Sequence, residues 1–267
     1  MTKEFCFTVD VDRDVNECVP GRRDAVSLRC SGARYTSSEA GTNILLDILD
    51  EIGIKATFFA EARTLENINF EAGNNEVAMH GLDHEDMTGK VSGVHITDGE
   101  LHEIMNTSMS IIKERTGKVP KGFRAPYMRT DARIMNTLKK NGIVYDSSVY
   151  ADVSKTMYPY DTGNGVIEIP IPVARDGNGK KIFGYLWPMH EGLRKPEDYI
   201  KMANCVEDGV FVIATHSWHM TESREGIMDA ERIRKNADSV KEIITSVLDS
   251  GFRAVRMTDV ADAYAGM

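Results

Sequence analysis

Two histidines lie four residues apart in the segment VAMHGLDHED, where an apolar run gives way to acidic residues. If this segment forms a helical turn, the imidazoles of His80 and His84 lie on one face and can bind the same metal ion. An ordinary loop is the alternative, because a chain with seven histidines often contains two at this spacing without function. The segment lacks the glutamate of a His-Glu-x-x-His motif, which excludes a zincin-type site.

Two aspartates alternate with apolar residues in TVDVDRD, where the first apolar segment ends. Asp10 and Asp12 are two positions apart, so their side chains would lie on the same face of a strand. Buried carboxylates repel each other, and a divalent cation or a shared proton relieves that repulsion. The pattern predicts a cation site, while Asp14 in the same segment fits the alternative of an acidic loop.

Three further polar residues come at the ends of later apolar segments. Arg124 in GFRAPYMR can pair with a carboxylate and never loses its charge, although a surface arginine in such a turn is common. Asp146 in YDSS is either an inward-facing carboxylate or a cap. His216 follows the apolar run VFVIA and is either a functional imidazole or a buried core histidine.

Together these residue types suit metal-assisted hydrolysis of an amide. Two histidines and a carboxylate leave an open position for water on a catalytic zinc or related divalent ion. The ion lowers the pKa of that water and polarises a carbonyl oxygen. A second carboxylate would take the proton of the water, and a separate histidine would give a proton to the leaving nitrogen.

The rest of the chain indicates how these residues could meet. Strand-like and helical segments alternate about seven times, which predicts a parallel sheet covered by helices, either doubly wound or closed as a barrel. The polar residues named above fall at the carboxyl ends of the expected strands. In a barrel those ends surround one mouth, where catalysis takes place.

No repeat, linker or low-complexity segment interrupts this alternation, so we expect one domain over residues 1–267. Residues 13–35 are polar and without a period, and they are expected to form a long, functional loop. The expected strands are 5–11, 54–60, 75–81, 122–126, 143–149, 165–171 and 210–216, with a last strand and a terminal helical turn in 252–264. The expected helices are 36–53, 97–117, 130–142, 194–209 and 226–251.

Composition restricts the class of protein. The net charge of −9 argues against a nucleic-acid or anionic-membrane partner. The chain has no apolar run long enough to span a bilayer, and its first residues lack the apolar core of a signal peptide, so we expect a cytoplasmic protein. The four cysteines show no C-x-x-C spacing and are expected to be reduced, with a Cys18–Cys30 pair or metal site as the alternative.

Motif by motif, the sequence resembles the polysaccharide deacetylase family, also called carbohydrate esterase family 4 or the NodB-homology domain. The resembling segments are TVDVD, HGLDH, RAPY, DSS and THSWH, and the resemblance extends from about residue 5 to 262. It implies an α/β fold, a distorted (β/α) barrel of about seven parallel strands.

The resemblance also implies how the reaction would be divided among the residues. Asp10 would be the general base, and His216 the general acid. Asp12, His80 and His84 would bind the metal. Zinc is the expected ion, with cobalt, nickel and manganese as alternatives.

Other positions are given supporting roles. Arg124 would tune the base, the N–H of Tyr127 would help to hold the oxyanion, and Asp146 would support the arginine network. Trp218 and Trp187 are candidates for apolar walls beside a ligand, although core packing is the commoner use of tryptophan.

The sequence departs from the common form of the family because Val11 separates the two aspartates. In this it resembles a subgroup that includes cytoplasmic peptidoglycan-deacetylase-like proteins and metal-independent allantoinase-like proteins. That subgroup tends to form tetramers, and its long first loop, here residues 13–35, can cover the site. The spacing leaves open whether Asp12 or Asp14 is the carboxylate ligand.

We therefore expect a metal-dependent hydrolase that removes an acetyl group from an N-acetylated sugar or related small amide. An allantoinase-like hydrolase of cyclic amides or imides is the alternative, and a non-catalytic carbohydrate-binding protein is the second. The expected partners are a small-molecule or sugar substrate and further copies of the chain in a homo-oligomer. Glu85 and Asp86 are expected to be solvated residues on a helix surface, and His219 is expected at the rim.

Overall fold

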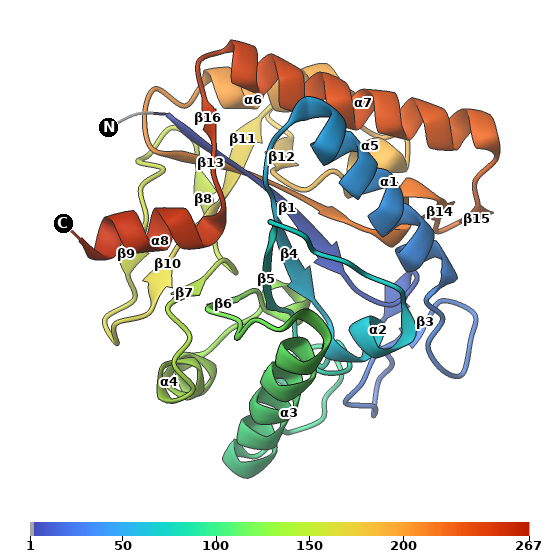
Figure 1. Ribbon diagram of the computed structural model, residues 1–267, viewed down its shortest axis with the longest axis vertical. Helices are drawn as coiled ribbons and strands as arrows, with labels where there is room; N and C mark the ends of the chain where they lie inside the picture. The colour runs from blue at the N-terminus through green and yellow to red at the C-terminus, as the bar shows by residue number, and fades with distance from the viewer. Residues whose placement is uncertain (1–2, 267) are drawn as a thin grey trace.

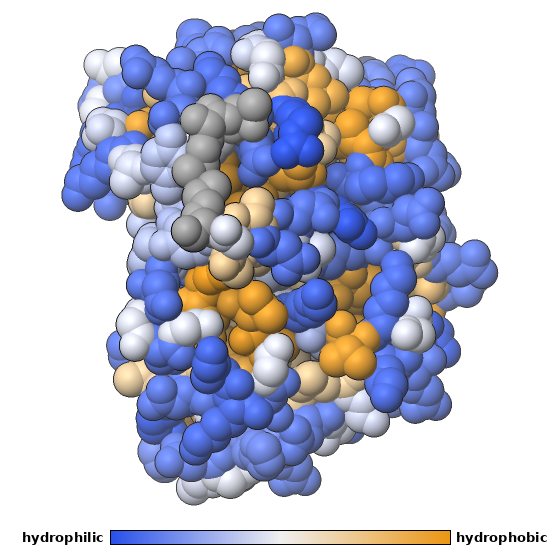
Figure 2. Space-filling model, turned by 60° about the vertical axis from the view of Figure 1, so that its left-hand side comes forward, coloured by the Kyte–Doolittle hydropathy of each residue, from blue (hydrophilic) through white to orange (hydrophobic). Residues whose placement is uncertain are grey.

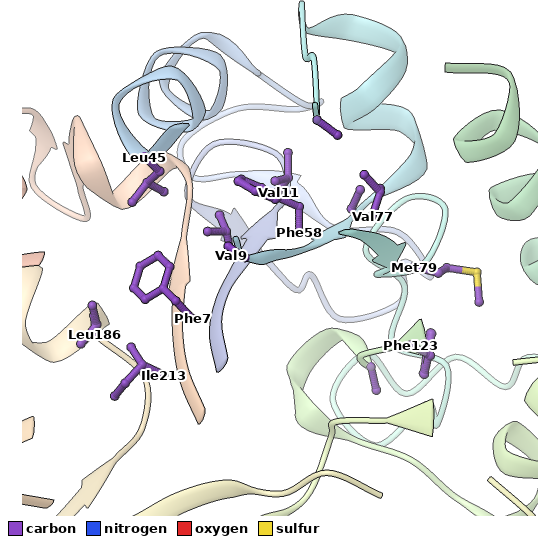
Figure 3. Close-up of a cluster of buried hydrophobic side chains, with 14 of the residues drawn as sticks. Phe7, Val9, Val11, Leu45, Phe58, Val77, Met79, Phe123, Leu186 and Ile213 are labelled. Carbon is purple, nitrogen blue, oxygen red and sulfur yellow. The ribbon is translucent and has the colours of Figure 1, made fainter. Parts of the chain in front are cut away.

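The two faces of the first strand carry different side chains, those of the core on one face and those of the site on the other. In the computed structural model, which describes residues 3–266, β1 (Glu4–Val11) alternates apolar and polar side chains. Its odd-numbered residues join the larger hydrophobic cluster, as Phe7 and Val9 show in Figure 3. Its even-numbered residues face the opposite side, because successive side chains of a strand alternate between the two faces. Asp10 therefore lies on the face opposite to the larger hydrophobic cluster.

Within residues 3–266, seven parallel strands form the centre of the main sheet, which confirms the predicted architecture. The sheet curls into a half-barrel, with helices on its outer side (Figure 1). In sheet order the parallel strands are β13 (Val210–His216), β1, β4 (Thr57–Ala60), β5 (Glu76–Met79), β6 (Gly122–Phe123), β7 (Tyr145–Asp146) and β10 (Ile167–Glu168). The antiparallel β9 (Tyr160–Asp161) follows β10, and β16 (Arg253–Ala254) pairs with the start of β1.

The helices bury apolar faces against the outer side of the sheet. Their ends follow local signals: a left-handed Gly53 stops the first long helix, and Thr97 with Glu100 forms a capping box before the third. The helices are α1 (Thr36–Ile52), α2 (Ala62–Asn67), α3 (Asp98–Thr116), α4 (Ala132–Lys140), α5 (Trp187–His190), α6 (Pro196–Asn204), α7 (Ala230–Asp249) and α8 (Met257–Ala265). Helix α8 differs from the rest, since it joins the smaller hydrophobic cluster on the inner face.

Several short elements were not predicted. The expected strand 165–171 divides at Pro170 into β10 and a strand of a second sheet, and the expected terminal turn is the nine-residue α8. The second sheet contains β8 (Tyr150–Asp152), β11 (Ile171–Arg175) and β12 (Lys181–Phe183). Two hairpins are β2 (Asn16–Glu17) with β3 (Val26–Ser27), and β14 (Glu222–Ser223) with β15 (Gly226–Ile227). Two 3₁₀ turns are η1 (Pro126–Met128) and η2 (Trp218–Met220).

Apolar and hydrophilic side chains are both exposed on the face shown in Figure 2. The face shown in Figure 2 is largely hydrophilic, with apolar side chains exposed in separate patches. All four cysteines are free, so Cys18 and Cys30 form no disulfide. No helix within the described residues 3–266 has the length and apolarity needed to cross a bilayer.

Candidate active site

Asp10 lies at the carboxyl end of β1, where two donors hold its carboxylate. Arg124 Nη1 donates to Oδ1 at 2.8 Å, and the Tyr185 hydroxyl donates to Oδ2 at 2.6 Å. Burial alone would raise the pKa of Asp10, but the charges of Arg124, His80 and His216 and the bond from Tyr185 hold it below its ordinary value. Asp10 is therefore ionised at neutral pH.

Arg124 is fully buried, and several parts of the chain satisfy its guanidinium. It donates to the hydroxyl of Thr8 at 2.9 Å and to the carbonyl oxygen of Ser147 at 3.1 Å. Its Cζ lies 4.0 Å from the ring centroid of Phe59, in a cation–π contact. A buried guanidinium held in this way keeps a fixed position, and so fixes the carboxylate of Asp10.

Asp12, His80 and His84 bring three metal-ligand side chains together. One ligand atom from each lies within 4.8 Å of the others, and all three residues are buried. Nε2 of His84 is 3.5 Å from Oδ2 of Asp12. Within the described residues, Oδ1 of Asp12 and Nδ1 of His84 have no hydrogen-bond partner. A carboxylate with two imidazoles is a donor set that suits zinc and related divalent ions, so the group fits such an ion.

The protonation of the histidines agrees with this use. Nδ1 of His80 lies 2.8 Å from the carbonyl oxygen of Arg124, which only accepts, so Nδ1 carries the proton and Nε2 keeps its lone pair. Burial lowers the pKa of both His80 and His84, so both imidazoles are neutral, as metal binding requires. Burial, followed by the charge of Asp10, raises the pKa of Asp12, and a cation would oppose both effects.

The two histidines are not placed by a helix, so the predicted helical turn is wrong. His80 directly follows β5, and the chain then turns through Gly81 and His84, whose φ angles are 82° and 52°. A side chain at position 81 would place Cβ 2.8 Å from Oε2 of Glu85, which adds to the need for glycine there. This tight turn brings the two rings edge to face, with centroids 5.0 Å apart.

Asp14 lies outside the metal-ligand group. Its carboxylate accepts the N–H groups of Ser37 and Ser38 in the first turn of α1, at 3.1 and 2.7 Å. Arg34 lies 3.7 Å from the same carboxylate. Asp14 thus stabilises the start of α1, and Asp12 is the carboxylate that lies beside the histidines.

His216 ends β13 directly beside Asp10, with which it is paired in the parallel register. Its ring stacks on Trp218 at 5.4 Å and lies 5.5 Å from the ring of Tyr185. Burial lowers the pKa of His216 to about 4, so the imidazole is neutral at neutral pH. Within residues 3–266 its Nδ1 has no hydrogen-bond partner. The imidazole is available to a ligand because it lines the cavity described below.

Trp218 and His219 are placed differently from the expectation, whereas Trp187 lies where it was expected. Trp218 is buried behind His216 and supports that ring, while the cavity wall contains Trp187, which is 41% exposed. His219 is not at a rim but buried, with its Nε2 3.0 Å from Oε1 of Glu191.

Asp146 pairs with Glu168 and Ser148 rather than with the guanidinium of Arg124. Ser148 donates to Oδ1 of Asp146 at 2.6 Å, and its hydroxyl accepts the N–H of Ala125 at 2.8 Å. Burial raises the pKa of Asp146 to about 6 and raises that of Glu168 as well, the charge of Asp146 adding to the second effect. Asp146 therefore supports the site indirectly. It binds the hydroxyl of Ser148, which in turn accepts the backbone N–H of Ala125, the residue after Arg124.

Glu85 and Asp86 are buried, which corrects the prediction of solvated helix residues. Glu85 accepts the N–H of Leu82 at 3.0 Å, and burial raises its pKa to about 7. Asp86 accepts the N–H groups of Val91 and Ser92 at 2.7 and 2.8 Å. Burial alone would raise the pKa of Asp86, but these bonds lower it below its ordinary value. Both acids thus hold the loop that follows the histidines.

The segment after Arg124 forms a strained turn. Tyr127 and Met128 both adopt left-handed backbone angles, with φ of 58° and 54°. Adjacent non-glycine residues in this region are rare and cost energy, and such strain is concentrated at functional sites. The turn places the ring of Tyr127 edge-on against His84, with centroids 4.7 Å apart.

A cavity of about 470 Å³ lies over these residues, at the carboxyl ends of the strands. From the loop of residues 13–35, Asn16 lines the cavity and donates to Asp12. Arg13 holds the base of this loop by a buried ion pair with Glu61. The loop that was expected to cover the site therefore borders the cavity.

Sequence reasoning missed Tyr185, which is the second donor to Asp10 and lines the cavity. It is 175 residues from Asp10 in the chain. It follows no expected strand, and its contact arises from an isolated bridge to Ala214 of β13. The aromatic run around it gave no local signal of this contact.

Comparisons with known proteins agree with the fold and the motifs. Residues 34–145 match the family model described as polysaccharide deacetylase. The peptidoglycan deacetylase-like protein FGM2 of Gibberella zeae is 29% identical over 167 residues, which are 60% of this chain and 47% of that protein. This chain thus spans about half the length of that relative.

Solved structures have the same fold at low sequence identity. A candidate polysaccharide deacetylase from Mycobacterium smegmatis superposes with a TM-score of 0.64 and 19% identity, over 98% of this chain and 90% of that one. The Puue allantoinase gives a TM-score of 0.63 and 16% identity, over 99% and 91%.

The class that these comparisons define is a fold: the curled, mostly parallel α/β half-barrel of the two solved structures above. Within this fold, residues 34–145 are similar to the polysaccharide deacetylase family, whose model they match.

Proposed function

We propose that this protein is a metal-dependent hydrolase that removes the acetyl group from an N-acetylated sugar or a related small amide. One observation carries the proposal: the ligand group of Asp12, His80 and His84 lies at the same mouth as Asp10, a carboxylate that Arg124 keeps ionised. Metal-assisted hydrolysis needs these two features side by side.

The residues of the chain have separable tasks in this reaction. A divalent ion held by Asp12, His80 and His84 would supply a polarised carbonyl and a more acidic water. Asp10 takes the proton of the attacking water, since it is ionised and faces the cavity. The N–H of Tyr127 is proposed to donate to the carbonyl oxygen as negative charge develops there.

His216 is proposed to protonate the leaving nitrogen. Because its pKa is about 4 in the free protein, it has to gain its proton during the reaction. The proton that Asp10 takes from water is a suitable source, since the two residues are neighbours on paired strands. The amine then leaves with that proton, and acetate remains.

The metal and the chemistry are tested together. Metal content is measured on the purified protein and on His80→Ala and His84→Ala, with the exposed His95→Ala as the matched control. Acetate release from N-acetylglucosamine oligomers is followed in the same preparations and in Asp10→Asn. We expect about one equivalent of metal, lost in the two ligand variants, and a rate that falls about 10²-fold or more in Asp10→Asn. Undiminished metal in both ligand variants would falsify the ligand assignment.

A cyclic amide or imide is the second candidate substrate. The loop of residues 13–35 contributes Asn16 to a cavity of about 470 Å³, and a small ring fits a volume of this size. The structural similarity to the Puue allantoinase covers nearly the whole chain. Ring opening of allantoin and of hydantoin, measured beside acetate release, separates the two candidates. Metal binding without turnover of either kind of substrate would favour a carbohydrate-binding protein.

We further propose a homo-oligomer, with a tetramer as the specific form, and a cytoplasmic location. Light scattering of the purified chain measures the first, and fractionation of the source cells measures the second. The net charge of −9 supports the absence of a nucleic-acid partner.

A further inference from the structure

Arg129 is a cation at the mouth of the cavity without a counter-charge. It lines the cavity and is exposed. Among the side chains of residues 3–266, none forms an ion pair or a hydrogen bond with its guanidinium. Arg124, by contrast, forms an ion pair with Asp10.

The two residues before Arg129 have strained backbone angles, and the chain stays at the cavity through this turn. Tyr127 and Met128 are both left-handed, and both line the cavity together with Arg129. Met128 is further held by the Tyr185 hydroxyl, which lies 3.4 Å from its sulfur. Strain of this kind persists only where the surroundings maintain it, and it points to a positioned functional group.

Among the described residues that line the cavity, Asp10 is the one carboxylate, and it already has a partner. Asp10 is balanced by Arg124, and Asp12 would be more than balanced by a divalent ion. Of the cavity-lining residues within 3–266, Arg129 is therefore the charged side chain left without a partner.

Aromatic side chains beside Arg129 offer a surface for the rest of a ligand. Tyr150 and Trp187 line the same cavity and are 38% and 41% exposed. Exposed aromatic faces of this kind bind sugar or planar rings, and a guanidinium binds carboxylate or phosphate through paired hydrogen bonds.

We propose that the site selects an amide substrate that carries an oxyanion, either carboxylate or phosphate, and that Arg129 binds this group. The proposal rests on the proposed function, because it concerns the same cavity. Arg129 then acts in specificity, outside the proton transfers of Asp10 and His216.

Matched compounds that differ in charge test the proposal. The sugar series contains N-acetylglucosamine, N-acetylmuramic acid and N-acetylglucosamine 6-phosphate, and the ring pair is dihydrouracil and dihydroorotate. The variants are Arg129→Gln, Arg129→Lys and the control Arg234→Gln, an exposed arginine on α7 outside the cavity. Both kcat/KM and the affinity by calorimetry are measured for each.

We expect the wild type to favour a charged member of a series. In Arg129→Gln the ratio of charged to neutral kcat/KM should fall by about 10-fold or more, as the loss of a charge-assisted pair predicts. Arg129→Lys should retain most of the wild-type ratio of charged to neutral kcat/KM, and Arg234→Gln should retain the whole ratio. The charged compound whose kcat/KM falls most in Arg129→Gln shows whether Arg129 binds a carboxylate or a phosphate.

Two results would overturn the proposal: a wild type that binds charged and neutral members equally, or an Arg129→Gln variant that loses both in the same proportion. Failure of the proposed function has a different signature, since no compound would then be hydrolysed. Calorimetry still compares the wild type with Arg129→Gln in that case, so the role of Arg129 is decided independently.

Discussion

At the scale of single residues, the site depends on a buried carboxylate that remains charged. Asp10 keeps its charge because Arg124 and Tyr185 supply hydrogen bonds that replace water. Arg124 is itself held by Thr8 and Ser147, so the position of the base depends on residues that never contact substrate. This arrangement makes the pKa of Asp10 the most informative observable of the site.

Tyr185→Phe should move the acidic limb of the kcat/KM profile to higher pH. The Tyr185 hydroxyl stabilises the ionised form of Asp10 by a hydrogen bond, so its loss raises the pKa of Asp10. The activity at the plateau of the profile should change less than the position of the limb. The measurement is the pH dependence of acetate release.

Tyr150→Phe is the matched control for this change. Tyr150 lines the same cavity, and Asp10 receives its hydrogen bonds from Arg124 and Tyr185 instead. An unchanged limb in Tyr185→Phe, or an equal movement in both variants, would contradict the role assigned to Tyr185.

At the scale of elements, the loop of residues 13–35 is fixed at its base by charges within the protein. The backbone N–H and Nε of Arg13 both donate to the carboxylate of Glu61, each at 2.8 Å, and Arg13 Nη2 donates to Asp83 at 3.0 Å. Glu61 also accepts the hydroxyl of Thr64 at 2.9 Å. The wall of the cavity therefore depends on a buried ion pair at the end of β1.

Arg13→Met should destabilise the protein by about 3–5 kcal/mol, because it leaves Glu61 as a buried charge without its partner. The double variant Arg13→Met/Glu61→Met should recover part of this loss, since it removes both charges. Urea unfolding gives the free energies of unfolding for the wild type, Arg13→Met, Glu61→Met and the double variant.

The exposed pair of Arg63 and Glu66 provides the comparison. Arg63→Met should cost less than about 1 kcal/mol, as exposed ion pairs generally do. A double variant at positions 13 and 61 as unstable as the sum of its two single variants would show that the buried pair is not the cause.

The sequence predicts elements better than the contacts between them. Alternation in β1 and the apolar run of β13 are local patterns, so they correctly placed Asp10 and His216 at strand ends. The turn between His80 and His84 depends on left-handed backbone angles, which a helical spacing does not reveal. The bond from Tyr185 to Asp10 joins residues 175 positions apart, and only the closed fold brings them together.

At the scale of the whole molecule, buried acids link stability to pH. Asp146 and Glu168 lie side by side, and burial raises the pKa of both above their ordinary values. The folded state therefore binds protons that the unfolded state releases. As the pH rises above the ordinary carboxyl pKa of about 4, this contribution to stability is progressively lost.

Glu168→Gln should reduce that loss. An amide cannot ionise, and its oxygen can still accept the N–H groups of Ser148 and Val149, which now donate to Glu168 at 3.1 and 3.0 Å. The variant should gain up to about 1.4 kcal/mol per pH unit over the wild type as the pH rises above about 5. Denaturant unfolding between pH 4 and 9 measures the difference.

The exposed Glu231→Gln on α7 controls for the loss of one negative charge. If the free energies of unfolding of Glu168→Gln and the wild type change in parallel with pH, the Asp146–Glu168 pair binds no extra proton in the folded state.

The pairing of β1 with β13 also has a consequence for synthesis. Residue 10 and residue 216 are neighbours in the finished sheet, yet β13 leaves the ribosome after most of the chain has been made. Until then the edge of β1 that β13 will cover has no partner, and an unpaired strand edge can pair with other chains. The nascent protein therefore carries Asp10 on an open strand edge, and a chaperone that binds extended segments would protect β1 until translation passes residue 216.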